Sequence, residues 1–435
     1  MGQCITSFVK NTHAGFIILH TRRHAAPGEI PVDAYIARQP IFNMKKQIFG
    51  YELLFRSGAS AENYTDSGAD QATSHVIMES FYSKGMDSIT GGKPAFVNFT
   101  ANLLLEKTAT LFPKDKLIVE ILETVEPTPE IIKACRALQR KGYKLALDDF
   151  VYCPELDPLI ELSRIIKFDF LCSSPQEITI MMKQVNLKGK WLLAEKIETN
   201  EMFDLARAMG FTLFQGYFFS KPETMSAKVL SPLKISYISL MREVSMGDNM
   251  DFQKVAKAIR DDVALSYKLL RLVNSAYYCL GTEVTDINRA VAIIGTIELR
   301  KWVFMIALMG LNTDKPDEII KMSMIRGRFI ENMNLKCKLV KSSESAFQTG
   351  LFSMLDVLME VPMNSALEGM LLAEEVREAL IYSGGPLFDL LKLVISLELS
   401  DWNTTDKLAQ QLNLNASLIS EEYLDAVKWC NDLAL

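Results

Sequence analysis

The chain has 435 residues, 49% of them hydrophobic and 23% charged, which indicates two packed domains and excludes a disordered chain. The formal net charge of −6 provides no basic face, so we expect no binding to duplex nucleic acid. Seven cysteines without a C-x-x-C pair, and no apolar run of the ~20 residues that span a bilayer, predict a cytoplasmic protein without a membrane span.

The first 31 residues are interpreted as an N-terminal extension. Beyond them, short β-rich runs alternate with helical stretches such as 129–141 and 200–209. The expected strands are 34–37, 48–55, 95–99, 116–122, 144–147, 165–168, 191–194 and 212–218. This alternation predicts an α/β domain with a parallel sheet, open or closed into a barrel.

Polar residues recur at or near the carboxyl ends of these strands. They are Glu52, Asn98, Glu120, Asp148, Asp149, Lys167, Asp169 and Glu195. In a closed barrel, side chains at that edge converge on one site, and carboxylate and amide oxygens suit a pair of hard divalent cations that act on a phosphodiester. Spacing alone leaves a structural alternative open, because a double aspartate is also typical of an ordinary strand exit.

The pattern changes after Pro222. Helical segments follow at 252–260, 266–274 and 288–294, without a convincing strand. We therefore expect a domain boundary between Pro222 and Pro232, with an α/β barrel at 32–225 and an all-α domain at 230–435.

Residues 51–56 (YELLFR) resemble the E-x-L-x-R signature of EAL domains, the phosphodiesterases that linearise cyclic di-GMP. Seven further motifs continue the resemblance in family order: RQPI at 38–41, VNFT at 97–100, VEILE at 119–123, ALDDF at 146–150, IKFD at 166–169, AEKIE at 194–198 and QGYFFSKP at 215–222. The resemblance covers about residues 32–225 and implies a TIM-like barrel.

The resemblance also implies roles for individual residues. The implied ligands of Mg²⁺ or Mn²⁺ are Glu52, Asn98, Glu120, Asp148 and Asp149. Lys167 would position the attacking water, and Glu195 would act as general base or as a further ligand, supported by Glu198 and Gln215. Gln39 and Arg56 would contact cyclic di-GMP, and Glu123 would brace the loop after the double aspartate.

That loop departs from the family pattern. Family members with turnover usually continue as D-D-F-G-T-G or D-D-F-G-A-G, whereas this chain has Val151 and Cys153 at the glycine positions and then Pro154. Leu53 replaces an alanine and Lys196 replaces a glycine of the family motifs. Glycine permits backbone angles that other residues resist, so the altered loop puts hydrolysis in question.

The helical half resembles HDOD domains at residues 259–276 and 287–295. These domains are all-helical relatives of HD phosphohydrolases without the catalytic metal residues. All four histidines precede residue 76, which excludes an HD metal site in this half. We expect Asp261 and Asp262 to form a turn between helices, and Asn274 to end a helix.

These features are compatible with three functions. The leading hypothesis is a cyclic di-GMP sensor whose HDOD domain carries the output to a protein partner. The first alternative is an active metal-dependent phosphodiesterase that produces linear pGpG and favours motility over biofilm. The second is a nucleotide-independent scaffold that recruits proteins. A homodimer is compatible with all three.

Overall fold

The computed structural model describes residues 34–57, 86–218, 232–274, 283–312 and 315–433. All contacts given below lie within the unit Val32–Leu435. The expected N-terminal extension, and almost all of the expected boundary between Pro222 and Pro232, lie outside the described residues.

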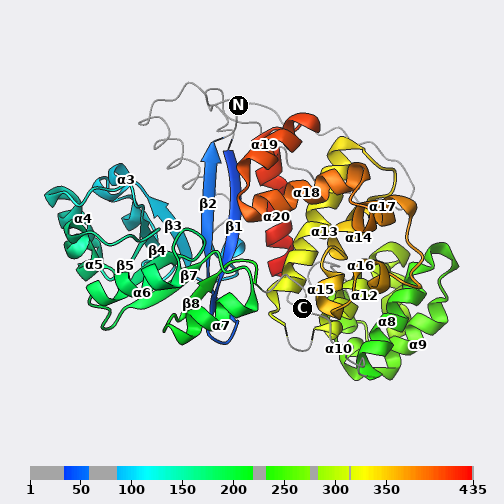
Figure 1. Ribbon diagram of the computed structural model, residues 1–435. Helices are drawn as coiled ribbons and strands as arrows, with labels where there is room; N and C mark the ends of the chain where they lie inside the picture. The colour runs from blue at the N-terminus through cyan, green and yellow to red at the C-terminus, as the bar shows by residue number, and fades with distance from the viewer. Residues whose placement is uncertain (1–33, 58–85, 219–231, 275–282, 313–314, 434–435) are drawn as a thin grey trace, which may run out of the picture. The chain divides into compact units, whose positions relative to one another are not determined.

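Eight strands close into a barrel in chain order (Figure 1). They are β1 (Ala34–Asn43), β2 (Ile48–Ser57), β3 (Ala95–Phe99), β4 (Leu117–Ile121), β5 (Lys144–Leu147), β6 (Ile165–Asp169), β7 (Trp191–Glu195) and β8 (Leu213–Gln215). The TIM-like barrel expected from the sequence is confirmed, and each strand overlaps the range predicted for it.

The first strand departs from the all-parallel sheet that the sequence predicted. β1 pairs antiparallel with both β2 and β8, whereas β2 to β8 pair in parallel. Only residues 44–47 separate β1 from β2. A connection this short forms a hairpin, because a parallel crossover needs about a dozen residues or more.

In the part of the barrel that the structure describes, five α-helices follow the strands: α3 (Ala101–Leu105), α4 (Pro129–Arg140), α5 (Asp157–Leu162), α6 (Pro175–Gln184) and α7 (Asn200–Ala208). Thr128, Ser174 and Thr199 begin α4, α6 and α7, and each accepts a hydrogen bond from the backbone N–H three residues later. These caps fix the entry of the chain into each helix and so hold the loops at the barrel mouth. A short α2 (Met86–Thr90) precedes β3.

The second half is helical. Its helices are α8 (Pro232–Ser245), α9 (Phe252–Asp261), α10 (Val263–Val273), α11 (Ile287–Ile294), α12 (Thr296–Leu311), α13 (Glu318–Cys337), α14 (Ser343–Leu351), α15 (Leu355–Met359), α16 (Met363–Ala366), α17 (Glu374–Ile381), α18 (Gly385–Leu399), α19 (Trp402–Gln411) and α20 (Ala416–Asp432). The long α13 packs against α14, α18 and α20, and most of its residues are buried. This confirms the all-α expectation.

Local details of this half also follow the sequence. Asp262 ends α9 and caps α10, where its side chain accepts from the N–H groups of Ala264 and Leu265. Asn274 ends α10 and exchanges two hydrogen bonds with the backbone of Val284. Among the described residues no single helix is long and apolar enough to cross a membrane; α17 and α18 reach that length and composition only together, with a bend of 46°.

Candidate active site

The barrel interior changes from apolar to polar along the strands. A buried apolar layer consists of Ile41, Phe96, Ile118, Ala146, Ile165, Leu193 and Leu213. Two positions further toward the mouth stand Gln39, Asn98, Glu120, Asp148, Lys167, Glu195 and Gln215. Because side chains two apart point to the same face of a strand, the period-2 pattern places the polar set above an apolar floor.

Lys167 lies at the centre of this polar layer. Its Nζ is 2.7 Å from Asp148, 2.8 Å from Glu120, 2.9 Å from Glu195 and 3.6 Å from Glu52. The lysine is fully buried, so these ion pairs are shielded from water and interact strongly. One ammonium faces four carboxylates, and an excess of negative charge remains.

Burial and this excess charge shift the titration of the cluster. Burial first, and then the neighbouring carboxylates, raise the pKa of Glu120 well above its usual value. The same causes raise the pKa of Glu195 to about 8. For Lys167, burial lowers the pKa, but the carboxylates together, Glu120 foremost, raise it well above the usual value. The lysine is therefore charged, and protons or another cation must offset the remaining carboxylates.

The donor set fits a divalent cation. Asn98 Oδ1, Glu120 Oε2 and Glu195 Oε2 are buried and have no hydrogen-bond partner among the described residues. Carboxylate oxygens of Asp148, Asp149 and Glu195 also lie within 4.8 Å of one another. Oxygen ligands with several negative charges are those that Mg²⁺ and Mn²⁺ prefer. Bound cations would satisfy these oxygens and relieve the repulsion among the carboxylates.

The rim of the site contains a second lysine. Asp149, with φ of 38°, and Lys196, with φ of 55°, both adopt left-handed backbone conformations that are uncommon for residues other than glycine. Lys196 Nζ pairs with Asp169, whose Oδ1 also accepts from the N–H groups of Leu171 and Cys172. Burial and Asp148 raise the pKa of Asp149, which Lys196 opposes. Lys196 thus adds positive charge beside the double aspartate.

The strained position in the altered loop is Asp149 and not the residues that replace glycine. Neither Val151 nor Cys153 has a positive φ, and Cys153 is extended, with φ of −140°. Val151 is 66% exposed. The sequence-based concern that these two residues resist their backbone angles therefore does not apply to this conformation. What the glycines would add is freedom to leave it.

A chain of amide hydrogen bonds connects the polar layer to β1. Gln215 Nε2 donates to Glu52 Oε2 at 2.6 Å and to Gln39 Oε1 at 2.8 Å. Gln39 Nε2 in turn donates to the carbonyl of Glu398 at 3.1 Å and to Ser400 Oγ at 3.3 Å. Gln39 and Glu52 are paired residues of the β1–β2 hairpin.

Arg56 follows Glu52 by four residues and lies on the same face of β2. Its Nη2 is 3.2 Å from Asp406 Oδ2 on α19, and its Nη1 is buried without a hydrogen-bond partner among the described residues. The guanidinium therefore has an unused donor beside the barrel mouth.

Two of the residues chosen from the sequence lie at the periphery. Glu123 and Glu198 are exposed, and among the described residues Lys167 pairs with neither of them. The other chosen residues line the barrel interior or its mouth. Sequence reasoning missed Asp406 and Ser400, which come from the other half of the chain and carry no local signal. The pairing of Lys196 with Asp169 likewise has no local sequence signal, because the two residues lie 27 positions apart.

Comparisons with known proteins now assign the family. The HDOD family model matches residues 232–378. The cyclic di-GMP phosphodiesterase CdgJ of Vibrio cholerae is 34% identical over 92% of this chain and 93% of its own length. The chain belongs to the EAL–HDOD family. Another relative, uncharacterized protein YuxH of Bacillus subtilis, is 35% identical over 92% of this chain and 98% of its own length.

Among solved structures, this EAL–HDOD chain matches a standalone EAL protein from Vibrio cholerae O395 in its c-di-GMP bound form. The identity is 22%, the match covers 47% of this chain and 98% of that one, and the TM-score is 0.37.

Proposed function

We propose that the barrel binds cyclic di-GMP at its mouth and hydrolyses one phosphodiester bond, with Mg²⁺ or Mn²⁺, to give linear pGpG. The observation that carries this proposal is the buried oxygen set above the apolar floor, in which Asn98, Glu120 and Glu195 each keep an oxygen without a partner among the described residues. A relative that matches nearly the whole chain is named a cyclic di-GMP phosphodiesterase, which supports the same assignment.

Each residue of the site has a proposed role. Arg56 contacts a phosphate of the nucleotide with its guanidinium fork, and Gln39 adds a hydrogen bond. Glu52, Asn98, Glu120, Asp148 and Asp149 would hold one or two divalent ions, which would supply a more acidic water and offset charge on the phosphate. Lys167 orients the attacking water, and Glu195 accepts its proton or joins the ligands. Glu198 and Gln215 support the site, and Glu123 braces the loop.

A second candidate is a receptor that binds the nucleotide with little turnover. The loop after the double aspartate favours it, because Cys153 is extended and Pro154 begins a short 3₁₀ turn. Proline fixes φ and reduces the conformational freedom of the chain. A stiff loop that holds Asp149 away from the geometry needed in the transition state would slow the reaction, whereas affinity would rest on Arg56 and the barrel walls.

In both cases we propose that the HDOD domain, at residues 230–435, passes the state of the barrel, at residues 32–225, to a protein partner. HD-type hydrolysis has no place in this half, because no histidine follows residue 75. A scaffold that ignores nucleotide would have no use for a buried carboxylate cluster, which is costly to maintain in a fold.

The experiment measures binding of cyclic di-GMP and formation of pGpG on the same purified protein, with Mg²⁺ or Mn²⁺. Arg56→Ala should weaken binding by ~1.5 to 3 kcal/mol, since charge-assisted phosphate contacts are worth about that much. Glu195→Gln should leave binding nearly unchanged and abolish product. Binding without product in the wild type would favour the receptor, and absence of binding would overturn both candidates.

A further inference from the structure

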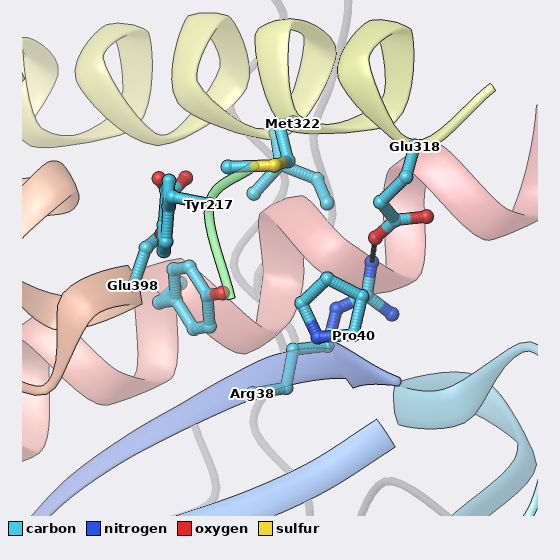
Figure 2. A pocket seen from close by; sticks show the side chains of 8 residues that line it. Arg38, Pro40, Tyr217, Glu318, Met322 and Glu398 are labelled. Carbon is cyan, nitrogen blue, oxygen red and sulfur yellow. Dashed lines mark ion pairs between the residues drawn. The ribbon is translucent and has the colours of Figure 1, made fainter. Parts of the chain in front are cut away.

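The β1–β2 hairpin, which carries Gln39, Glu52 and Arg56, is held by the helical half of the chain. Helices α18 and α20 pack on β1. The buried Arg38 lies 3.8 Å from Glu318 of α13 (Figure 2). Glu318 also accepts a hydrogen bond from the hydroxyl of Tyr51 at 3.0 Å. Tyr35 stacks on Trp402 of α19 with ring centroids 6.0 Å apart.

Gln39 and Arg56 contact groups of the helical half that resemble parts of a nucleotide. Arg56 faces the carboxylate of Asp406, and Gln39 donates to the carbonyl of Glu398 and the hydroxyl of Ser400. A nucleotide could make the same two kinds of contact. Its phosphodiester offers an anionic oxygen to the guanidinium of Arg56, and its ribose offers neutral oxygen acceptors to the amide of Gln39. The segment from Ser400 to Asp406 therefore engages the same two side chains that the proposed function assigns to the nucleotide.

This segment follows α18 through a residue in an unusual conformation and continues into the rest of α19, where the buried Thr405 shares a hydrogen bond of 2.8 Å with Ser396 of α18. Ser400 ends α18 with φ of 58°, and Asp401 then caps α19. The body of α18 is held by a buried ion pair between Glu398 and Arg326. Arg326 Nη2 and Nε donate to Glu398 Oε2 at 2.6 Å and 3.0 Å. By contrast, the side chains of Arg56 and Asp406 are 36% and 16% exposed, so that pair can exchange partners at lower cost.

We propose that the Ser400–Asp406 segment is a built-in competitor of the nucleotide: cyclic di-GMP and this segment bind Gln39 and Arg56 alternately. This inference rests on the proposed nucleotide site. The competition is reciprocal. If the segment weakens the binding of nucleotide, then bound nucleotide weakens the contacts of the segment with Gln39 and Arg56 by the same free energy. Occupancy of the barrel is thereby transmitted to α19, and any partner that pulls the segment away raises the affinity for the nucleotide.

The test uses the full chain in EDTA, so that metal-dependent turnover is absent, with cyclic di-GMP as the probe. Asp406→Asn removes the charge that competes for Arg56 and should tighten nucleotide binding by about 2- to 5-fold, the range expected for a partly exposed ion pair. The control is Asp432→Asn, an exposed carboxylate at the end of α20, which should bind as the wild type does.

A second measurement needs no substitution. Hydrogen exchange of the wild type with and without cyclic di-GMP should show faster exchange in residues 400–407 when the nucleotide is bound, while the body of α18 is unchanged. If the wild type binds in an Arg56-dependent way but Asp406→Asn has equal or weaker affinity and exchange does not increase, the competitor is refuted and the nucleotide site stands. If no variant binds in EDTA or with Mn²⁺ added, the nucleotide site itself is refuted, and the competitor with it. Binding by Asp406→Asn alone would support the competitor.

Discussion

At the scale of single residues, Lys167 controls the charge of the barrel mouth. Its ammonium lies within 3 Å of Asp148, Glu120 and Glu195, in a place where water cannot compensate for its loss. A lysine so placed stabilises the fold when no cation is bound. It also limits how tightly a cation binds, because both positive charges face the same carboxylates.

We expect Lys167→Met to destabilise the protein by ~3 to 5 kcal/mol, the usual cost of breaking a buried ion pair. Saturating Mn²⁺ should then raise the melting temperature of the variant more than that of the wild type. Thermal melting with and without Mn²⁺ measures both effects. Lys133→Met, at an exposed position on α4, is the matched control. Equal Mn²⁺ shifts in Lys167→Met and in the wild type would show that cations do not bind at this cluster.

The raised pKa of Glu195 predicts that the stability of the fold and its affinity for cations both depend on pH. Burial raises its pKa from 4.5 to about 8, so the fold keeps a proton that the unfolded chain releases near pH 4.5. The contribution of Glu195 to stability therefore falls as pH rises from about 4.5 to about 8, because the native state binds more protons there. A cation must displace this proton, and its affinity should rise by up to about tenfold per pH unit toward pH 8.

Mn²⁺ affinity measured at several pH values between 6 and 8 tests this expectation. Glu195→Gln should bind Mn²⁺ more weakly and with a flatter dependence on pH. A wild-type affinity that does not change over this range would mean that Glu195 is not among the groups that lose a proton to the ion.

At the scale of elements, the double aspartate belongs to the loop between β5 and α5, which contains Val151 and Cys153 at the glycine positions of the family motif. Val151→Gly together with Cys153→Gly should raise kcat more than it changes the dissociation constant of cyclic di-GMP, because the contacts of Gln39 and Arg56 are untouched. The two glycines should also lower stability by about 1 to 2 kcal/mol through the entropy of the unfolded chain. A wild type that already turns over rapidly, with no gain in the variant, would show that this loop does not limit the reaction.

The strands of the barrel can be predicted from the sequence, but the long-range contacts of the site cannot. All eight strands were found, because buried β-rich runs with polar residues at their ends are a local signal. The antiparallel start was missed, although the four residues between β1 and β2 were already too few for a crossover. The hydrogen bond from Gln39 to Glu398 spans 359 positions, and no local pattern in one sequence predicts such a pair. Likewise, the strand ends indicated a convergent site, but not that Lys167 would occupy its centre.

At the scale of the whole molecule, the pair of Arg38 and Glu318 joins the barrel to α13. Glu318→Ala would leave the buried Arg38 without this carboxylate and remove the acceptor of Tyr51, so we expect a loss of ~3 to 5 kcal/mol. The barrel and the helices should lose stability together. Denaturation followed by fluorescence at Trp191, in a variant in which Trp302, Trp402 and Trp429 are replaced by Phe, measures the barrel. The Trp191→Phe variant, which keeps those three tryptophans, measures the helical half. The control is Glu374→Ala at an exposed position of α17, and separate transitions for the two halves would contradict the expectation.

Because β1 and β2 form a hairpin at the start of the barrel, the barrel is not expected to be stable as a separate fragment. The outer face of β1 has no helix from the β1–β2 connection to cover it, and α13, α18 and α20 of the HDOD half lie there instead. A fragment that ends before α8 would expose Ile36 and the ring of Tyr51 to water and leave Arg38 without its ion pair. Such a fragment should self-associate when it is produced alone. Recombination that exchanged one half for an unrelated domain would meet the same obstacle, so the two halves are expected to be inherited as one piece.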